Sequence, residues 1–215
     1  MAPPQVFPRL SRGDLPPRIV EPPPGPRSRE ISRGLDRFLA PGLSTVVAGE
    51  PSLVWEEALG SNVLDVDGNV FVDLTAGFSV ASIGHRRPEV VAAVAAQAAL
   101  LVHALGDVAA HPARLDLARR LAERAPVGTA GDDLQVFFAV SGAEAVEIAL
   151  KTALAATRKP GVVAFDPGYH GLSLGALAVT SRPAFREPFS PHLHGHVERF
   201  AFGGPLDALA SRLER

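Results

Sequence analysis

The sequence predicts an α/β protein in which a parallel sheet follows a small group of antiparallel strands. In the second half of the chain, short apolar runs at 134–140 and 162–166 alternate with stretches of helical spacing. This alternation is typical of a parallel sheet with right-handed crossover helices. In the first half, residues 53–74 change to an apolar period of two, which is typical of half-buried antiparallel strands.

The composition argues against several classes of protein. The 215 residues carry a formal net charge of −2, which argues against nucleic acid or another polyanion as a partner. Cysteine is absent, so neither a disulfide framework nor a thiolate metal site is expected. The longest apolar runs are short and carry polar residues, so we expect no membrane span. No basic segment followed by an apolar core indicates a secretory signal, so the cytoplasm is the expected compartment.

The first thirty residues are rich in proline and arginine and show no apolar periodicity. The prolines are densest at Pro22–Pro24. We therefore expect residues 1–30 to form a disordered or polyproline-II-like extension. A short helix is predicted to follow over 31–39.

Three short strands are predicted next, at 54–58, 62–66 and 69–74, because apolar and polar residues alternate there. The turns between them fall at Gly60–Ser61 and Asp67–Asn69, and Asp-Gly is a strong hairpin signal. Trp55 is expected to pack on this sheet rather than to contact a ligand.

A glycine-bearing loop over 75–84 contains Phe78 and leads to His85. A lone histidine has no built-in ligand partner, so we expect His85 to make a structural hydrogen bond. The remaining elements are predicted as helices at 90–105, 114–124, 171–179 and 206–213, strands at 162–166 and 197–202, and a loop at 181–195.

The stretch from Leu134 to Leu150 carries the clearest functional signal. Its apolar first half suits a strand buried on both faces, and its second half has helical spacing. Between them lie three small residues, Ser141, Gly142 and Ala143. A strand that turns sharply into a helix over small residues leaves free amides at the helix N-terminus, where an anion such as phosphate can bind. A capped helix after a strand also occurs without any ligand, so both interpretations stay open on geometry alone.

The segment Ser-Gly-Ala-Glu-Ala-Val-Glu-Ile-Ala-Leu-Lys at 141–151 resembles the cofactor-phosphate segment of class III aminotransferases, which use pyridoxal 5′-phosphate (PLP). Two further stretches resemble the same family. Gly168-Tyr169-His170-Gly171 follows the apolar run 162–165 at the family's spacing. The third stretch is Asp65-Val66-Asp67-Gly68-Asn69, followed by Val72-Asp73-Leu74, Ala76-Gly77, Gly84-His85 and Pro88. Together and in order, the three stretches cover about residues 45–180.

The resemblance implies fold type I of the PLP-dependent enzymes, in a truncated form. Residues 31–84 would be an N-terminal segment of the small domain, and residues 85–215 an incomplete PLP-binding large domain with a parallel sheet. The amides of Ser141, Gly142 and Ala143 would hold the cofactor phosphate.

The aromatic segment is given two candidate contacts by the resemblance. Tyr169 would stack on the pyridine ring, and the alternative is an aromatic packed beside a strand end. His170 is a possible second contact.

Glu144 can complete a capping box with Ser141, either as a capping residue only or also facing the pocket. In the family the loop at 75–84 approaches the substrate or a dimer interface, which makes Phe78 a candidate substrate contact.

The lysines indicate what this chain lacks. PLP enzymes need a lysine for the internal Schiff base, and only Lys151 and Lys159 are present. Lys151 lies ten residues after Ser141, about 15 Å along a helix, and Lys159 is further still. Neither is expected to reach the ring. In the family the lysine and the acidic partner of the pyridine nitrogen come from sequence beyond residue 215, so no catalytic residue is expected here and the chain alone should be inactive.

The implied reaction moves an amino group from an amine or amino acid to a 2-oxo acid, in a homodimer if the protein is complete. Two alternatives stay open: a non-catalytic fragment or half-enzyme completed by a second chain, and other class III chemistry such as that of a racemase, aminomutase or decarboxylase. Leu172 stands where members acting on acetylornithine-type substrates carry arginine, which does not support that specificity. A nucleotide-binding domain is disfavoured because no P-loop or Gly-x-Gly-x-x-Gly turn is present.

Three histidines, His192, His194 and His196, alternate near the end of the chain. On a strand they would share one face and suggest a metal site. We favour a solvated loop beside Pro191 and expect no metal, because a site needs a further well-placed ligand.

Overall fold

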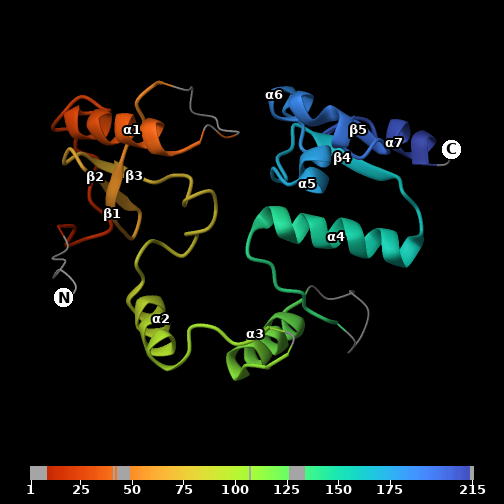
Figure 1. Ribbon diagram of the computed structural model, residues 1–215, viewed down its shortest axis with the longest axis horizontal. Coiled ribbons are helices and arrows are strands. Elements are labelled where there is room, and N and C mark those ends of the chain that lie inside the picture. The colour runs from red at the N-terminus through yellow and green to blue at the C-terminus, as the bar shows by residue number, and fades with distance from the viewer. Residues whose placement is uncertain (1–8, 41, 43–48, 107, 126–133, 214–215) are drawn as a thin grey trace. The chain divides into compact units, whose positions relative to one another are not determined.

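The computed structural model describes residues 9–40, 42, 49–106, 108–125 and 134–213 (Figure 1). They belong to two compact units, Met1–Ala110 and His111–Arg215, and each is described by itself. The predicted boundary between a small-domain segment and a large domain at residues 84 and 85 stays a prediction. No helix in the described part of the chain has the length and apolar character needed to cross a bilayer.

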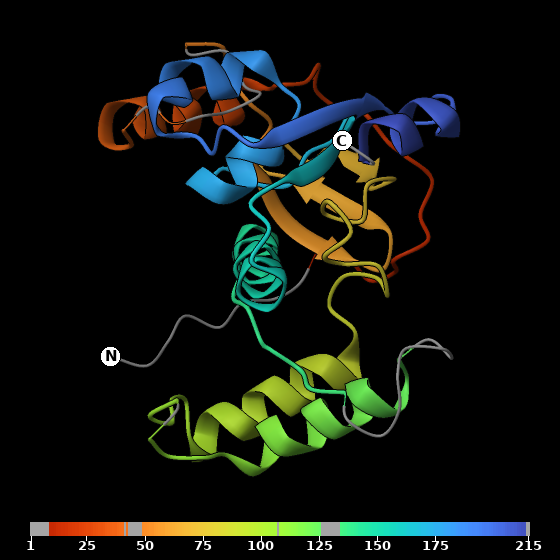
Figure 2. The same ribbon diagram turned by 90° about the vertical axis from the view of Figure 1, so that its right-hand side faces the viewer.

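The first unit is built on an antiparallel sheet of three strands in the order β1-β2-β3. These are β1 (Trp55–Leu59), β2 (Asn62–Asp65) and β3 (Val70–Val72), which Figure 2 shows as a twisted sheet. The three predicted strands and both turns are therefore confirmed. Helix α1 (Pro26–Phe38) precedes the sheet and α2 (Pro88–Leu100) follows it. The core of the unit contains Leu10, Leu64 and Val70, with Leu15 and Leu59 packed against it.

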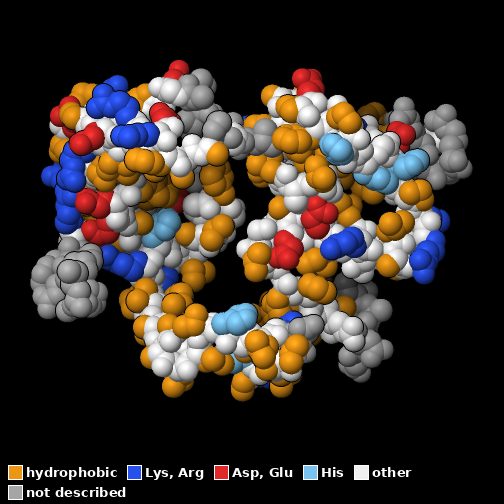
Figure 3. Space-filling view, in the orientation of Figure 1, with side chains coloured by type: hydrophobic (Ala, Val, Ile, Leu, Met, Phe, Trp, Pro, Cys, Tyr) orange, Lys and Arg blue, Asp and Glu red, His pale blue; other side chains and the backbone are white. Residues whose placement is uncertain are grey.

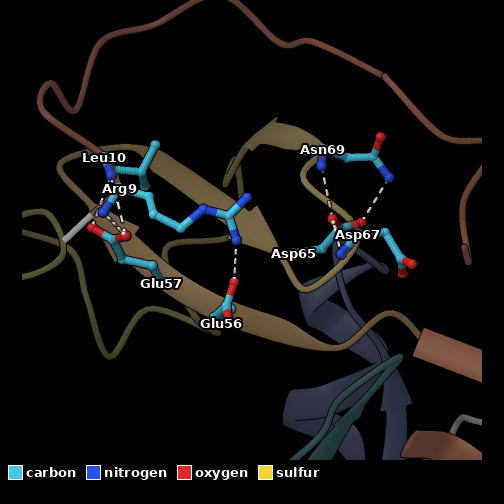
Figure 4. A network of polar contacts seen from close by, with 7 residues as sticks. All are labelled: Arg9, Leu10, Glu56, Glu57, Asp65, Asp67 and Asn69. Carbon is cyan, nitrogen blue, oxygen red and sulfur yellow. Dashed lines mark hydrogen bonds and ion pairs between the residues drawn. The ribbon is translucent and has the colours of Figure 1, made fainter. Parts of the chain in front are cut away.

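The sequence predicts a disordered or polyproline-II-like extension over residues 1–30, of which residues 1–8 lie outside the described residues. The stretch from 9 to 21 is bonded to this sheet at several points, and residues 26–30 belong to α1. The amides of Arg9 and Leu10 donate to the Glu57 carboxylate (Figure 4). Further along, the amide of Leu15 donates to Asn62 Oδ1 at 2.6 Å, and that of Val20 to Asn69 Oδ1 at 2.8 Å. Arg18 also pairs with Val70 of β3 through backbone hydrogen bonds in both directions, each 2.8 Å long. Sequence periodicity misses this arrangement because the partners lie far away in the sequence and most of them are side chains.

Helix α1 also begins earlier than predicted, at Pro26 instead of residue 31. Proline suits the first turn of a helix because its missing N–H has no partner there. The helix is capped from outside, since the Asp67 carboxylate accepts from the amides of Arg27 at 2.8 Å and Ser28 at 3.0 Å. The β2–β3 turn (Figure 4) is shaped by Asp65, which accepts from the Asn69 amide at 2.8 Å.

The loop after β3 is organised by Asp73. Its carboxylate accepts from the amides of Thr75 at 3.0 Å and Gly77 at 2.8 Å, and lies 2.8 Å from His85 Nε2. The structural hydrogen bond predicted for His85 is thus confirmed. This bond is the largest cause that lowers the pKa of Asp73 to about 2. The rings of Trp55 and His85 also meet edge to face, with centroids 6.3 Å apart.

The second unit carries the predicted parallel pair, β4 (Val162–Asp166) and β5 (Val197–Ala201). The helices of this unit are α3 (Pro112–Glu123), α4 (Gly142–Thr157), α5 (Leu174–Val179), α6 (Pro183–Arg186), the 3₁₀ helix η1 (Glu187–His192) and α7 (Leu206–Leu213). Ala164 is buried in β4, and four residues of α5 are buried: Ala176, Leu177, Ala178 and Val179.

Two predictions for this unit are wrong. Residues 134–140 form no strand, and Phe137 and Val140 are 75% and 96% exposed. A strand needs neighbours for its backbone groups, and no described segment pairs with this one. The predicted loop at 181–195 contains α6 and η1. Prolines stand in the first turn of both, where they start a helical turn instead of breaking it.

Candidate anion site at the start of helix α4

Helix α4 begins with the predicted cap. Ser141 Oγ accepts from the amide of Glu144 at 3.1 Å, as a capping serine does. The Glu144 carboxylate reaches back to the amide of Val140 at 2.6 Å, one residue before the cap. Glu144 therefore serves as a capping residue, and its carboxylate is directed at the chain that enters the helix.

The amides of Gly142 and Ala143 remain open. In the described part of the chain neither donates a hydrogen bond, whereas the amide of Ala145 is already bonded to the Ser141 carbonyl at 3.0 Å. The space around the turn is also open, because a Cβ on Gly142 would meet no heavy atom within 4 Å. Two free amides and the positive end of a 16-residue helix attract anions.

The loop that carries Tyr169 lies directly beside this turn. A Cβ on Gly171 would come within 2.5 Å of the Ala143 Cβ, so the two backbones approach more closely than any side chain at 171 allows. Gly171 also has a φ of +127°, a conformation that other residues rarely adopt. The small residues at 143 and 171 thus bring the turn and the loop into contact.

These segments enclose an open depression of about 560 Å³, called here the α4 hollow. It is lined by Ser141, Gly142, Ala143, Val146, Tyr169, His170, Gly171, Leu172 and Ser173. The structure thus brings five of the predicted cofactor residues to one place. The sixth, Glu144, is outside the lining. Tyr169 is 61% exposed, so its ring is accessible to a ligand.

Several residues that sequence analysis missed hold the Tyr169 loop in place. Thr180 Oγ1 accepts from the His170 amide at 2.9 Å, and Ser181 Oγ accepts from the Gly168 amide at 2.9 Å. Glu147 of α4 accepts from the amides of Gly175 and Ala176. The partners are 10 to 29 residues apart in the sequence, so no local pattern could predict them.

Glu147 is ionised in this setting. Burial alone would raise its pKa, but hydrogen bonds from Ser173 and from the amides of Ala176 and Gly175, with the charge of Lys151, lower it below the usual value. The carboxylate therefore stays charged near neutral pH and interacts with the amides at the start of α5.

The remaining candidate residues lie elsewhere. Lys151 and Lys159 line a different cavity of about 360 Å³, and neither borders the α4 hollow. His194 Nε2 is 2.7 Å from the Pro160 carbonyl, and the described residues contain no group of three side chains suited to a metal ion. Phe78 belongs to the other unit and is 90% exposed.

The fold matches that of known PLP-dependent aminotransferases. The solved taurine:2-oxoglutarate aminotransferase from Bifidobacterium kashiwanohense, in complex with PLP and glutamate, superposes with a TM-score of 0.69 at 24% identity, over 81% of this chain and 38% of that one. The partial α/β architecture, with its parallel pair and antiparallel strands, is therefore that of fold type I, as predicted.

Sequence comparison defines the family. The family model described as Aminotransferase class-III matches residues 45–210, so the chain belongs to the class III aminotransferases. An acetylornithine aminotransferase from Methanopyrus kandleri is 41% identical over 147 residues, which are 68% of this chain and 34% of the relative. An alanine/serine racemase from Pyrococcus horikoshii is 36% identical over 165 residues, which are 77% of this chain and 33% of the relative. The chain thus spans about a third of the length of these two relatives.

Proposed function

We propose that this chain provides the phosphate-binding part of a PLP-dependent transaminase. The observation that carries the proposal is the pair of open amides at Gly142 and Ala143, beside an accessible tyrosine ring in the same hollow. These features fit a phosphorylated pyridine. The helix N-terminus suits the phosphate dianion, and the aromatic face suits the ring.

Five residues of the α4 hollow and the neighbouring Glu144 each have a defined task in this proposal. The amides of Gly142 and Ala143 donate to the phosphate. The Ser141 hydroxyl accepts from the Glu144 amide, so its own proton is available to the same anion. Tyr169 lies against the ring and His170 gives a second contact. Glu144 keeps the turn in shape through Val140.

When bound, the cofactor supplies an electron sink for moving an amino group from an amine or amino acid to a 2-oxo acid. No lysine lines the α4 hollow. We propose that the reactive lysine and the partner of the pyridine nitrogen come from polypeptide outside residues 1–215, either in the same protein or in a second chain. By this proposal the chain is inactive alone, and the completed enzyme acts in the cytoplasm.

A homodimer is part of the proposal, with Phe78 contacting the substrate. The first unit exposes apolar side chains that a second protomer could cover (Figure 3). On α2, Val90, Val91 and Val94 are 44%, 49% and 63% exposed, and Phe78 is 90% exposed. Apolar patches of this kind often mark protein interfaces.

A second candidate reaction is amino-acid racemisation. It is favoured by the relative from Pyrococcus horikoshii named alanine/serine racemase, which is 36% identical to this chain. The phosphate and ring contacts proposed for the α4 hollow are the same for both reactions.

The proposal is tested by titrating the chain with pyridoxine 5′-phosphate, which lacks the aldehyde and so cannot condense with Lys151 or Lys159. Gly142→Asp places a carboxylate about 5 Å from the bound dianion, which costs roughly 2–3 kcal/mol and weakens binding about 30- to 150-fold. An acid in the first turn is favourable for the helix, so the variant should stay folded.

Gly142→Ala is the matched control, because the space around this Cβ is open. It should bind like the wild type. Equal affinity of all three proteins would show that the turn holds no phosphate and would overturn the proposal.

A further inference from the structure

Glu147 links the helix that carries the phosphate turn to the segment that follows Tyr169. It lies one turn of α4 beyond Ala143. Its Oε1 accepts from the amides of Gly175 at 2.7 Å and Ala176 at 3.1 Å, the second and third residues of α5, whose amides have no acceptor within that helix. Ser173, the residue preceding α5, gives that helix no side-chain cap. Glu147 therefore caps α5 from another helix.

The contact is tight as well as charged. A Cβ on Gly175 would lie 2.3 Å from Glu147 Oε2, so a larger residue at 175 would displace the carboxylate. Because the Glu147 carboxylate is ionised, both hydrogen bonds are stronger than bonds from the same amides to a neutral acceptor.

The Tyr169 loop is attached to α4 by two contacts that act in opposite directions. The packing of Gly171 on Ala143 limits how closely the loop can approach the turn. The hydrogen bonds from α5 to Glu147 limit how far the loop can move away. Thr180 and Ser181, at the other end of α5, accept hydrogen bonds from the loop. The loop and that helix are therefore expected to move together.

We propose that Glu147 is a positioning residue that sets the separation between the phosphate turn and the Tyr169 ring, so that one ligand can contact both. This inference rests on the proposed function. Glu147 itself is not in the lining of the α4 hollow and touches neither the phosphate nor the ring.

The test compares two probes on the full chain, inorganic phosphate and pyridoxine 5′-phosphate. In the wild type, the ring contact with Tyr169 should make pyridoxine 5′-phosphate bind about 3- to 10-fold more tightly than phosphate. In Glu147→Ala the affinity for phosphate should stay within about twofold of the wild-type value. The advantage, which is the ratio of the affinity for pyridoxine 5′-phosphate to that for phosphate, should fall toward one. Tyr169 is the single tyrosine, so fluorotyrosine labelling gives one ¹⁹F signal from the ring. That signal should move on addition of pyridoxine 5′-phosphate in the wild type and should not move in Glu147→Ala.

Two substitutions distinguish the effect of the length of the Glu147 side chain from the effect of its charge. Glu147→Gln keeps the length of the side chain and an acceptor oxygen, so it should retain most of the advantage. Glu147→Asp keeps the charge but is one methylene shorter, so it should lose the advantage, and it replaces Glu147→Ala if that variant does not fold. Glu187→Ala, in η1, is a matched removal of an exposed glutamate and should behave like the wild type.

The outcomes distinguish the two proposals. If wild-type protein binds neither probe, the proposed function fails. If the wild type favours pyridoxine 5′-phosphate and both Glu147→Ala and Glu147→Asp keep that preference with an unchanged ¹⁹F response, the positioning role of Glu147 is overturned.

Discussion

Replacing Gly171 by alanine tests the packing on which the α4 hollow depends. The added Cβ would lie 2.5 Å from the Ala143 Cβ, 2.8 Å from the Ala143 Cα and 3.2 Å from the Ala176 Cβ. All three neighbours are Cα or Cβ atoms of alanine, so no flexible side chain can move aside. The φ of +127° adds a conformational penalty.

The magnitude follows from the two effects. Overpacking a close contact costs about 1–3 kcal/mol, and holding a residue other than glycine in a rarely populated conformation costs about 1–3 kcal/mol. The free energy of unfolding should fall by roughly 2–6 kcal/mol if the structure does not relax. Relaxation lowers that cost only by moving the Tyr169 loop away from the turn, so binding of pyridoxine 5′-phosphate weakens instead.

The assay is urea unfolding with and without pyridoxine 5′-phosphate, on Gly171→Ala and on Gly195→Ala. Gly195 lies in the same unit, has no positive φ and would meet no atom within 4 Å of an added Cβ. Its replacement should be neutral or stabilise the unit by up to about 1 kcal/mol. If Gly171→Ala equals Gly195→Ala in both stability and ligand binding, the close approach of residues 143 and 171 does not exist.

Three further predictions concern single contacts. Asp73 has a pKa lowered to about 2 from the ordinary 3.8, so its stabilising effect is complete above that ordinary value and is lost as the pH falls toward 2. In His85→Phe, NMR titration of the Asp73 carboxyl should give a higher pKa, and acid unfolding should begin at a higher pH; an unchanged titration curve would contradict the assigned hydrogen bond. Asp67→Ala removes the acceptor at the start of α1, so circular dichroism should show a lower urea midpoint for the first unit, and no change would mean that the cap adds nothing. Ser141→Ala removes the α4 cap and should lower stability by about 1 kcal/mol in the same measurement, whereas a neutral result would count against that cap.

Local patterns in the sequence predict an element correctly where residues close together in the chain determine its structure. The period of two and the Asp67-Gly68 turn predict the antiparallel strands, and the apolar runs at 162–166 and 197–202 predict the parallel pair. Ser141 and Glu144 predict the start of α4, because a cap depends on residues only three apart.

The missed features depend on contacts between distant residues. The apolar run at 134–140 has the composition of a strand, but a strand also needs a partner, which no described segment supplies. Several amides between residues 9 and 28 donate to side chains about 40 to 50 residues away, such as Asn69, and the Arg18 amide donates to the Val70 carbonyl. Glu147 reaches α5 across 28 residues, and nothing in its immediate sequence distinguishes it from a solvated glutamate.

The central claim is that the first amides of α4 hold a phosphoryl group. Amide chemical shifts of ¹⁵N-labelled protein, followed during titration with pyridoxine 5′-phosphate and with unphosphorylated pyridoxine, test it most directly. We expect the largest shifts at Gly142 and Ala143 with the phosphorylated compound and small ones without the phosphate. If these two amides stay unchanged while signals elsewhere move, the phosphate binds at another place and the assignment of the α4 hollow is wrong.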